Sequence, residues 1–288
     1  GAWTASPQAR ELLKKLPEIK DPKNLQTYFF STLLEKLEGR DLEMHVWEEM
    51  VLLKDESGVY KPNPAFAGKK VVPYIWNNMF DYPDLGYQLA NMGYDVVLCN
   101  VSNFYFDLAY SNDPEEPGLY WAGFVNTKNA WAFAPYDWFK TTYKTSMGRT
   151  IDRAKEFKDM VRINPDAKDH IIGLEAQLWT ETVKGSDMAE YYMFPKMLGF
   201  AESAWAAERD WEKEPDLVKM DQNIAKGWNQ FANRIGQTAL AKLSWWNGGY
   251  NYRIAPPGAK VEDGKLFANV NFPGLQIRYT TDGSEPNE

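Results

Sequence analysis

The sequence has 288 residues, which is enough for one large domain or two ordinary ones. The 40 acidic and 32 basic residues give a net charge of −8, which argues against a nucleic-acid partner, because such a partner needs a basic face. No apolar run is long enough to span a membrane, the single cysteine excludes an intramolecular disulfide, and the two histidines argue against a zinc site.

Helical and strand patterns alternate along most of the chain. The apolar spacing of residues 24–40, with Asn24 at a capping position, predicts a helix. Residues 41–52 and 69–78 each predict a strand, and a helix is predicted through residues 82–93. This alternation is typical of parallel α/β architecture.

Two further strands are predicted at residues 95–107 and 170–181, separated by a long insert at residues 108–169. A helix is predicted at residues 186–206, and Pro195 within it predicts a kink. Because side chains alternate along a strand, residues 170–181 have one apolar face and one polar face. The polar face predicts a site for chemistry or for a ligand, and its members are Gly173, Glu175, Gln177, Trp179 and Glu181.

The four strand–helix steps predict an α/β fold, namely the C-terminal part of a (β/α)8 TIM barrel. Each strand ends in polar or aromatic residues, and the carboxyl ends of barrel strands form the active site in this architecture. A doubly wound open sheet would alternate in the same way, but it usually has a glycine-rich first turn, which this sequence lacks. A full barrel typically needs about 250 residues. The insert at residues 108–169 takes up much of this chain and only four strands are predicted, so we expect half a barrel.

The sequence changes character near residue 248, where two prolines and several turn residues indicate a domain boundary. Alternating apolar and polar positions and Asp-Gly turn chemistry then predict a small β-module. We therefore predict two domains. Residues 1–250 form the C-terminal portion of the barrel, and residues 251–288 form the start of a C-terminal β-sandwich-like module.

Several motifs together resemble one enzyme family, the family 20 glycoside hydrolases, which are β-N-acetylhexosaminidases. In the barrel region these motifs are "NLQTYFF", "NFYFD", "GLYWAG", "GLEAQLWTE" and "FPKMLGFAESAW". "NYRIAPPG" and "GLQIRYTTDGSEP" resemble the C-terminal β-module that often follows this barrel. The resemblance runs in order over nearly the whole chain.

The resemblance implies an exo-acting enzyme that removes terminal N-acetylglucosamine or N-acetylgalactosamine from β-linked glycans, without a metal or a cofactor. Its mechanism is substrate-assisted, because the oxygen of the substrate's 2-acetamido group attacks the anomeric carbon. In the family, an Asp-Glu catalytic pair ends the fourth barrel strand, and a stretch like "GAWTASPQ" follows it. That stretch is residues 1–8 here, so we expect the pair to lie upstream, with about strands five to eight in this chain.

Seven residues are candidate site residues, and four of them, Tyr105, Asp107, Trp121 and Glu181, match positions that the family uses. Tyr105 matches the tyrosine that donates a hydrogen bond to the acetamido oxygen, which suits a phenol because it is protonated at neutral pH. Asp107 and Glu181 match carboxylates that bind sugar hydroxyls. An aromatic content of 15% is consistent with a carbohydrate site, although core packing is the competing interpretation for each ring. The expected aromatic box around the acetamido group and the sugar comprises Trp47, Trp76, Trp121 and Trp179.

Two alternatives stay open on the sequence. A non-catalytic sugar-binding protein derived from this barrel would keep the tryptophans and lose the acid. A different retaining glycosidase would use two carboxylates, with Glu49, Asp107 or Glu181 as the nucleophile and no role for Tyr105. Glu48 and Glu49 match neither member of the family's catalytic pair.

Some further expectations concern the protein as a whole. We expect the isolated chain to self-associate or to need the missing N-terminal half, because exposed strand edges pair with other chains. Family analogy indicates a periplasmic or secreted bacterial parent protein. Lys196 stands where many relatives carry arginine, a change expected to affect packing more than chemistry, and Cys99 is expected to be a buried structural thiol.

Overall fold

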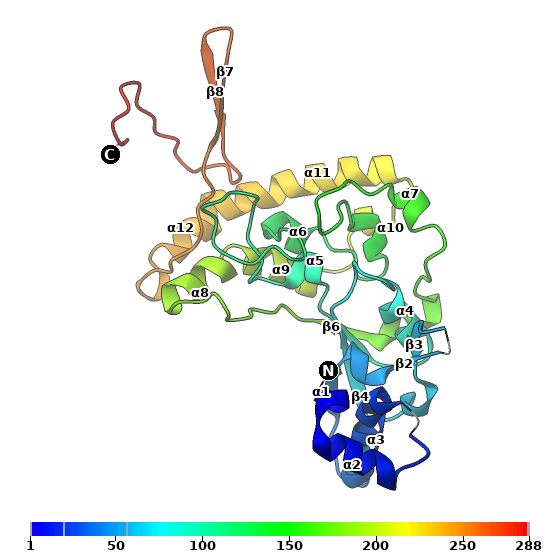
Figure 1. The fold of residues 1–288 in the computed structure, drawn as a ribbon. Coiled ribbons are helices and arrows are strands. Elements are labelled where there is room, and N and C mark those ends of the chain that lie inside the picture. The colour runs from blue at the N-terminus through cyan, green and yellow to red at the C-terminus, as the bar shows by residue number, and fades with distance from the viewer. Residues whose placement is uncertain (1, 20, 56, 287–288) are drawn as a thin grey trace. The chain divides into compact units, whose positions relative to one another are not determined.

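The computed structural model describes residues 2–19, 21–55 and 57–286. The chain forms two compact units, which Figure 1 shows with their helices and strands labelled. Unit 1 comprises Gly1–Asn100 and Asp159–Leu174, and unit 2 comprises Val101–Lys158 and Glu175–Glu288. The chain therefore passes from unit 1 to unit 2 twice, each time shortly after a strand of the unit 1 sheet ends.

Unit 1 is built on a parallel sheet of four strands in the order β1-β4-β5-β6, of which β4 and β6 are labelled in Figure 1. Apolar β-branched residues dominate β4 and β5, as expected for parallel strands that are buried on both faces. Tyr74 pairs with Trp47 on one side and with Val97 on the other. The four strands are β1 (Met44–Trp47), β4 (Val71–Ile75), β5 (Val96–Leu98) and β6 (Ile171–Leu174).

The sequence predicted all four strands but overestimated the length of each. The strand predicted at residues 41–52 is interrupted by the 3-10 turn η2 (Glu48–Val51), after which β2 (Leu52–Lys54) pairs antiparallel with β3 (Tyr60–Pro62). The carboxylate of Glu48 accepts the backbone N–H of Trp76 at 3.2 Å. At Trp76 the backbone N–H is therefore bonded to a side-chain carboxylate and not to a backbone carbonyl, so the ladder between β1 and β4 does not continue there.

Two of the other overestimates have a common reason. The strand predicted at residues 95–107 ends at Leu98 and is followed by the helix α5 (Val101–Phe104), and the strand predicted at residues 170–181 ends at Leu174. Beyond these ends, Tyr105 and Gln177 form an isolated parallel bridge. Alternating side chains over residues 173–181 therefore indicate an extended chain with one polar face, which does not require a continuous ladder.

The helices of unit 1 precede and connect these strands. The helix predicted at residues 24–40 is α3 (Leu25–Leu37), which begins directly after Asn24 as expected. Ser6 caps α2, because its hydroxyl accepts the backbone N–H of Ala9 at 3.3 Å. The remaining helical segments are α1 (Ala2–Ala5), α2 (Pro7–Lys15), η1 (Pro22–Asn24), η3 (Pro64–Phe66), α4 (Leu85–Asn91) and η5 (Pro165–His170).

Unit 2 is mainly helical in its second half. The helix predicted at residues 186–206 is broken at Phe194 and Pro195 into α8 (Ser186–Met193) and α9 (Lys196–Trp205), so the proline ends one helix and precedes the next. The other helical segments are α6 (Thr127–Trp131), η4 (Trp138–Thr141), α7 (Arg153–Glu156), α10 (Asp210–Lys213), α11 (Leu217–Arg234), η6 (Ile235–Ala239), α12 (Leu240–Leu243) and η7 (Trp246–Gly248).

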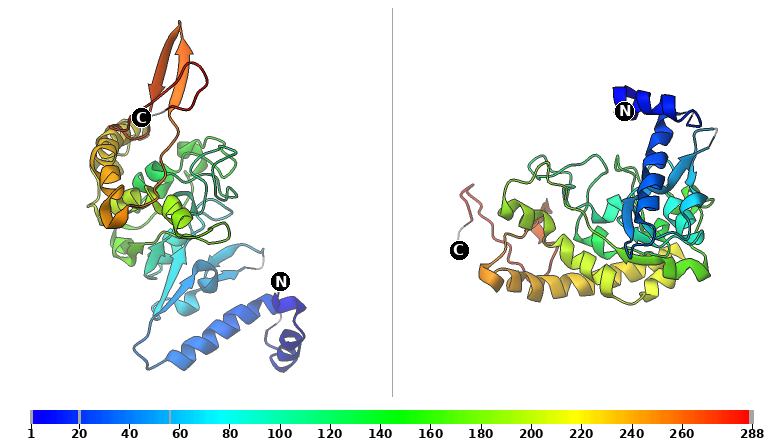
Figure 2. Two further views of the ribbon diagram at one scale, coloured as in Figure 1. Left: turned by 90° about the vertical axis from the view of Figure 1, so that its left-hand side faces the viewer. Right: turned by 90° about the horizontal axis from the view of Figure 1, so that it is seen from below.

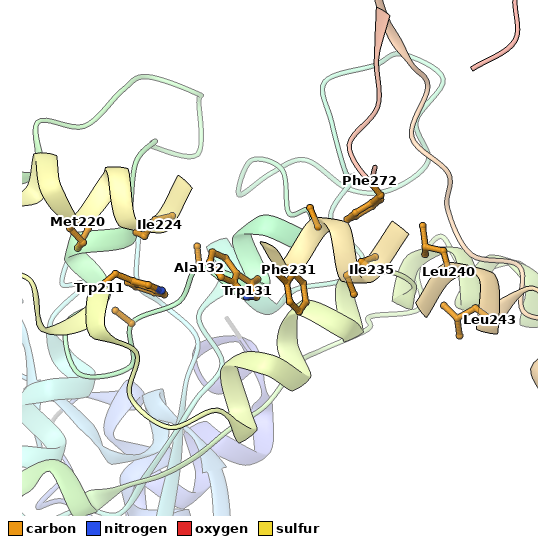
Figure 3. Close-up of a cluster of buried hydrophobic side chains, with 12 residues drawn as sticks. Trp131, Ala132, Trp211, Met220, Ile224, Phe231, Ile235, Leu240, Leu243 and Phe272 are labelled. Atoms are coloured by element: carbon orange, nitrogen blue, oxygen red, sulfur yellow. The ribbon is translucent and has the colours of Figure 1, made fainter. Parts of the chain in front are cut away.

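An aromatic cluster forms a core of unit 2 (Figure 3). Trp131 of α6 stacks on Phe231 of α11 with ring centroids 5.7 Å apart, and it also contacts Trp211 at 6.0 Å. Phe272, which follows the last strand, packs into the same cluster. Gly236 lies directly beneath Pro273, where a Cβ atom would overlap the Pro273 carbonyl oxygen, so glycine permits this close approach. The cluster therefore attaches the C-terminal segment to α11.

The predicted β-module contains one hairpin. The strands β7 (Gly258–Glu262) and β8 (Lys265–Asn269) are joined by Asp263 and Gly264, both at positive φ, as a tight hairpin turn requires. The residues of both strands are exposed, and the hairpin extends away from the helices of unit 2 (Figure 2, left). Residues 275–281 also alternate in sequence, but they form no strand in the described part of the chain.

Candidate active site

Five of the seven predicted site residues lie in unit 2, on three segments of chain. Tyr105 and Asp107 follow α5, Trp121 lies in the loop after Gly118, and Trp179 and Glu181 follow β6. The two others, Trp47 and Trp76, belong to unit 1.

Backbone hydrogen bonds hold the three unit 2 segments side by side. The N–H of Phe106 donates to the carbonyl of Gln177 at 2.7 Å, and the N–H of Gln177 donates to the carbonyl of Phe104 at 3.0 Å. The carbonyl of Asp107 accepts the N–H of Leu119 at 2.9 Å. Gly118 makes this approach possible, because a Cβ atom there would lie 2.9 Å from the Asp107 carbonyl oxygen and its φ is +130°.

These bonds place Tyr105 between two tryptophans. The ring centroid of Tyr105 lies 6.1 Å from that of Trp121 and 6.2 Å from that of Trp179, both in edge-to-face geometry. Tyr105 is only 5% exposed, whereas Trp121 and Trp179 are 46% and 40% exposed. These three rings, one buried and two partly exposed, are here called the aromatic box, and the exposed parts of the two tryptophans offer aromatic surface of the kind that can contact a ligand.

Asp107 is a buried carboxylate beside this box. It is 1% exposed, and its Oδ1 atom accepts the backbone N–H of Trp179 at 3.4 Å. Its Oδ2 atom is buried and has no hydrogen-bond partner among the described residues. Burial raises the pKa of Asp107, and the neighbouring charge of the exposed Glu181 acts in the same direction, while nearby N–H groups and Lys196 oppose it. A buried acceptor of this kind is suited to a hydroxyl donor.

A second polar pair lies next to the bridge between the segments. The side-chain amide of Gln177 donates to Glu175 at 2.9 Å. This part of the polar face therefore contains a hydrogen bond between two of its own side chains.

In unit 1, the predicted residues Trp47 and Trp76 pack on the same face of the sheet. Together with Tyr74 they cover a small buried cluster of Val72, Val97 and Cys99, so Cys99 is the buried thiol that was predicted. The rings of Trp47 and Tyr74 meet edge to face at 6.2 Å.

Glu48 and Glu49 hold Trp76, a role that the sequence did not reveal. Glu48 is buried and accepts the backbone N–H of Trp76, while Glu49 accepts its indole N–H at 2.8 Å. Burial raises the pKa of Glu48 well above its ordinary value, and the charge of Glu49 adds to this effect. The only available signal was the position of the two acids immediately after Trp47.

The described residues contain neither a metal-binding group of side chains nor a membrane-spanning helix. No group of three or more histidine, cysteine, aspartate or glutamate side chains in residues 2–19, 21–55 and 57–286 is arranged to hold a metal ion. Within the same residues, no helix has the length and apolar character that crossing a membrane requires.

Comparison with known proteins identifies two family models along the chain. Residues 1–208 match "Glycosyl hydrolase family 20, catalytic domain", and residues 239–288 match "Chitobiase/beta-hexosaminidase C-terminal domain". N,N'-diacetylchitobiase of Vibrio harveyi is 38% identical over 293 aligned residues, which cover 98% of this chain and 31% of that protein. Beta-hexosaminidase of Vibrio vulnificus is 28% identical over 313 aligned residues, covering 98% of this chain and 34% of that protein.

Solved structures agree on the fold. A family 20 exo β-N-acetylglucosaminidase from Vibrio harveyi, determined with N-acetylglucosamine, aligns with a TM-score of 0.50 and 24% identity, covering 78% of this chain and 30% of that one. The chain thus spans about a third of the length of the curated relatives it matches. It has the α/β architecture of a TIM barrel with a C-terminal domain, and it belongs to glycosyl hydrolase family 20.

Proposed function

We propose that this chain forms strands five to eight of the catalytic barrel of an exo-acting β-N-acetylhexosaminidase, here called the parent enzyme. The parent enzyme hydrolyses terminal N-acetylglucosamine or N-acetylgalactosamine in β-linked glycans. The observation that carries the proposal is the box of Tyr105, Trp121 and Trp179 beside the buried carboxylate of Asp107. The names of the two Vibrio relatives, a chitobiase and a beta-hexosaminidase, support it.

The nucleophile in this proposal is the acetamido oxygen of the substrate. It bonds to the anomeric carbon as the bond to the leaving oxygen breaks, and the leaving oxygen takes a proton from a general acid. Water then attacks the anomeric carbon of the oxazolinium intermediate, which restores the acetamido group and releases the sugar. Tyr105 donates its O–H to the acetamido oxygen, and the rings of Trp121 and Trp179 enclose the methyl group and exclude water.

The carboxylates of the site bind the sugar in this proposal. A sugar hydroxyl donates to the buried Oδ2 atom of Asp107, which satisfies that acceptor. Glu181 is exposed and accepts a second hydroxyl. Trp47 and Trp76, at the carboxyl ends of β1 and β4, remain predicted substrate-binding residues.

The general acid and the aspartate that orients the acetamido group are assigned to an Asp-Glu pair outside these 288 residues. The chain does contain the dipeptide Asp55-Glu56, of which Glu56 lies outside the described residues. Asp55 accepts the backbone N–H groups of Ser57 and Val59 and pairs with Lys61 at 2.8 Å, so its carboxylate stabilises the turn between β2 and β3. This environment does not fit a catalytic acid pair.

The proposed function is tested by comparing two aryl glycosides. The parent enzyme is expected to hydrolyse 4-nitrophenyl N-acetyl-β-glucosaminide and to leave 4-nitrophenyl β-glucoside intact, because the glucoside lacks the acetamido nucleophile. Release of nitrophenol is the measurement. Hydrolysis of both substrates would favour a two-carboxylate glycosidase, and binding of N-acetylglucosamine without hydrolysis would favour a sugar-binding protein.

We also propose that the isolated 288-residue chain self-associates or requires another segment to complete its sheet. Among the described strands of that sheet, β1 pairs only with β4 and β6 pairs only with β5, so both outer edges carry unpaired backbone groups. Light scattering of the purified chain is expected to give a mass above that of a monomer. A monodisperse, cooperatively melting monomer would contradict this expectation.

A further inference from the structure

A fully buried lysine lies behind Asp107. Lys196 is the first residue of α9, and its side chain has no solvent exposure. Its Nζ atom donates to the carbonyl of Phe106 at 2.8 Å and to the carbonyl of Leu108 at 2.7 Å. These two carbonyls stand on either side of Asp107, so Lys196 holds the backbone both before and after the carboxylate.

Aromatic rings enclose the remaining sides of the same ammonium group. Nζ lies 3.9 Å from the ring centroid of Tyr110 and 6.0 Å from that of Tyr192. The ring of Tyr110 is itself fixed, because its hydroxyl donates to the carbonyls of Tyr191 and Tyr192, each at 3.2 Å. The lysine therefore has a defined position and cannot move toward water without disrupting this packing.

A lysine in such a place is costly for the fold. Burial lowers the pKa of Lys196 well below its ordinary value, while the charges of Asp107 and Glu116 oppose the shift and Arg253 adds to it. A methionine of similar length would fill the same volume without the cost of removing an ammonium group from water. Because burial alone would favour methionine, we infer that the lysine has a functional role at the neighbouring candidate site.

The task follows from the limited support that Asp107 has otherwise. Its carboxylate accepts a long hydrogen bond from the Trp179 N–H, interacts with its own backbone N–H, and experiences the unfavourable charge of Glu181. The direction of a short side chain is set by the backbone on either side of it, and Lys196 fixes that backbone at both carbonyls. The charge of Lys196 also lowers the pKa of Asp107, against the effect of burial.

We propose that Lys196 is a positioning residue for Asp107, which it orients through the two flanking carbonyls, so that Asp107 can accept a sugar hydroxyl. This inference rests on the proposed function and extends it to a residue that does not touch the substrate. The expectation that lysine in place of arginine affects packing more than chemistry remains a prediction, which the Lys196→Arg variant tests.

The experiment compares Lys196→Met, Lys196→Gln and Lys196→Arg in the parent enzyme. Lys196→Met is expected to raise KM for the aryl N-acetyl-β-glucosaminide about tenfold or more, because it removes hydrogen bonds from a charged donor. Lys196→Gln keeps donors without charge, so the acidic limb of its KM–pH profile is expected to move to higher pH. Lys196→Arg restores both donors and charge and is expected to stay close to the wild type. Lys226→Met, at an exposed lysine of α11, serves as the control.

A double-mutant cycle decides whether Lys196 acts through Asp107. In an Asp107→Asn background, the Lys196→Met change is expected to have little further effect on KM or on the affinity for N-acetylglucosamine measured by calorimetry. Full additivity, an unchanged KM in folded Lys196→Met, or failure of both uncharged variants to fold would overturn the inference. A wild-type enzyme that binds N-acetylglucosamine without hydrolysing the aryl substrate would instead refute the proposed function, and the binding cycle would still test Lys196.

Discussion

Replacing Tyr105 with phenylalanine in the parent enzyme is expected to lower kcat by about 10²–10³-fold, the range found when one oxyanion-type donor is removed. The phenol's hydrogen bond holds the acetamido oxygen in line with the anomeric carbon, an alignment that the attack needs and that substrate binding does not, so losing it is expected to slow the chemical step. KM should therefore change much less than kcat. Steady-state kinetics with the aryl N-acetyl-β-glucosaminide measure both constants.

The geometry makes this substitution a clean test of the hydroxyl. Tyr105 is held by ring contacts with Trp121 and Trp179 and by backbone bonds at Phe104 and Phe106, all of which phenylalanine retains. Tyr120→Phe is a matched control, because Tyr120 is the exposed tyrosine next to Trp121 and its hydroxyl has no assigned role.

Glu181→Gln supplies the contrast. In the proposed function Glu181 binds a sugar hydroxyl before the reaction begins, so this variant is expected to weaken substrate and inhibitor binding together and to raise KM. If Tyr105→Phe and Glu181→Gln gave the same pattern of kcat and KM, the division of roles between them would be wrong.

The parallel architecture could be predicted because the strands are read from short apolar runs. "VVPYI" and "VVL" are short runs of apolar and aromatic residues rich in valine, as is typical of buried parallel strands. The strand ends could not be predicted in the same way. They depend on contacts with residues distant in sequence, such as the bond from the Trp76 N–H to the carboxylate of Glu48, 28 residues earlier.

The proximity of the candidate site residues could be predicted where a local sequence pattern links them. Alternation over residues 173–181 placed Trp179 and Glu181 on one face, and the "NFYFD" motif supplied Tyr105 and Asp107. The structure brings these four together with Trp121. The complete burial of Lys196 was not predicted, because charged residues at helix starts are normally exposed and nothing in the local sequence indicates that this one is buried. Its carbonyl partners lie 88 and 90 residues away.

Glu116 and Arg253 form another buried contact that the local sequence does not reveal, because the two residues are 137 positions apart. The Nε atom of Arg253 donates to Oε1 of Glu116 at 2.8 Å, and an Nη atom donates to Oε2 at 2.6 Å. The two side chains are only 7% and 5% exposed. Burial raises the pKa of Tyr191 to about 12, and its hydroxyl remains a donor to Glu116 at 2.7 Å. The pair thus joins the segment after α12 to the loop that runs from Asp107 to Trp121.

Replacing Arg253 with methionine in the parent enzyme is expected to lower the free energy of unfolding by about 3–5 kcal/mol, because it leaves the carboxylate of Glu116 buried without its cation. Urea unfolding followed by tryptophan fluorescence measures the change. Arg234→Met is the matched control, since Arg234 pairs with Glu202 at 2.8 Å with side chains that are 61% and 35% exposed. Exposed pairs contribute about 0–1 kcal/mol, so this variant should unfold almost as the wild type does.

If Arg253→Met is destabilised because the carboxylate of Glu116 is left buried without a cation, then removing that carboxylate should restore part of the lost stability. Adding Glu116→Leu to Arg253→Met removes the stranded carboxylate, so the double variant is expected to be more stable than Arg253→Met alone. Because the Arg253 backbone N–H still donates to the carbonyl of Phe194 at 3.0 Å, the segment after α12 keeps one anchor in every variant. A double variant that is less stable than either single variant would mean that Glu116 acts mainly through Tyr191 rather than through Arg253.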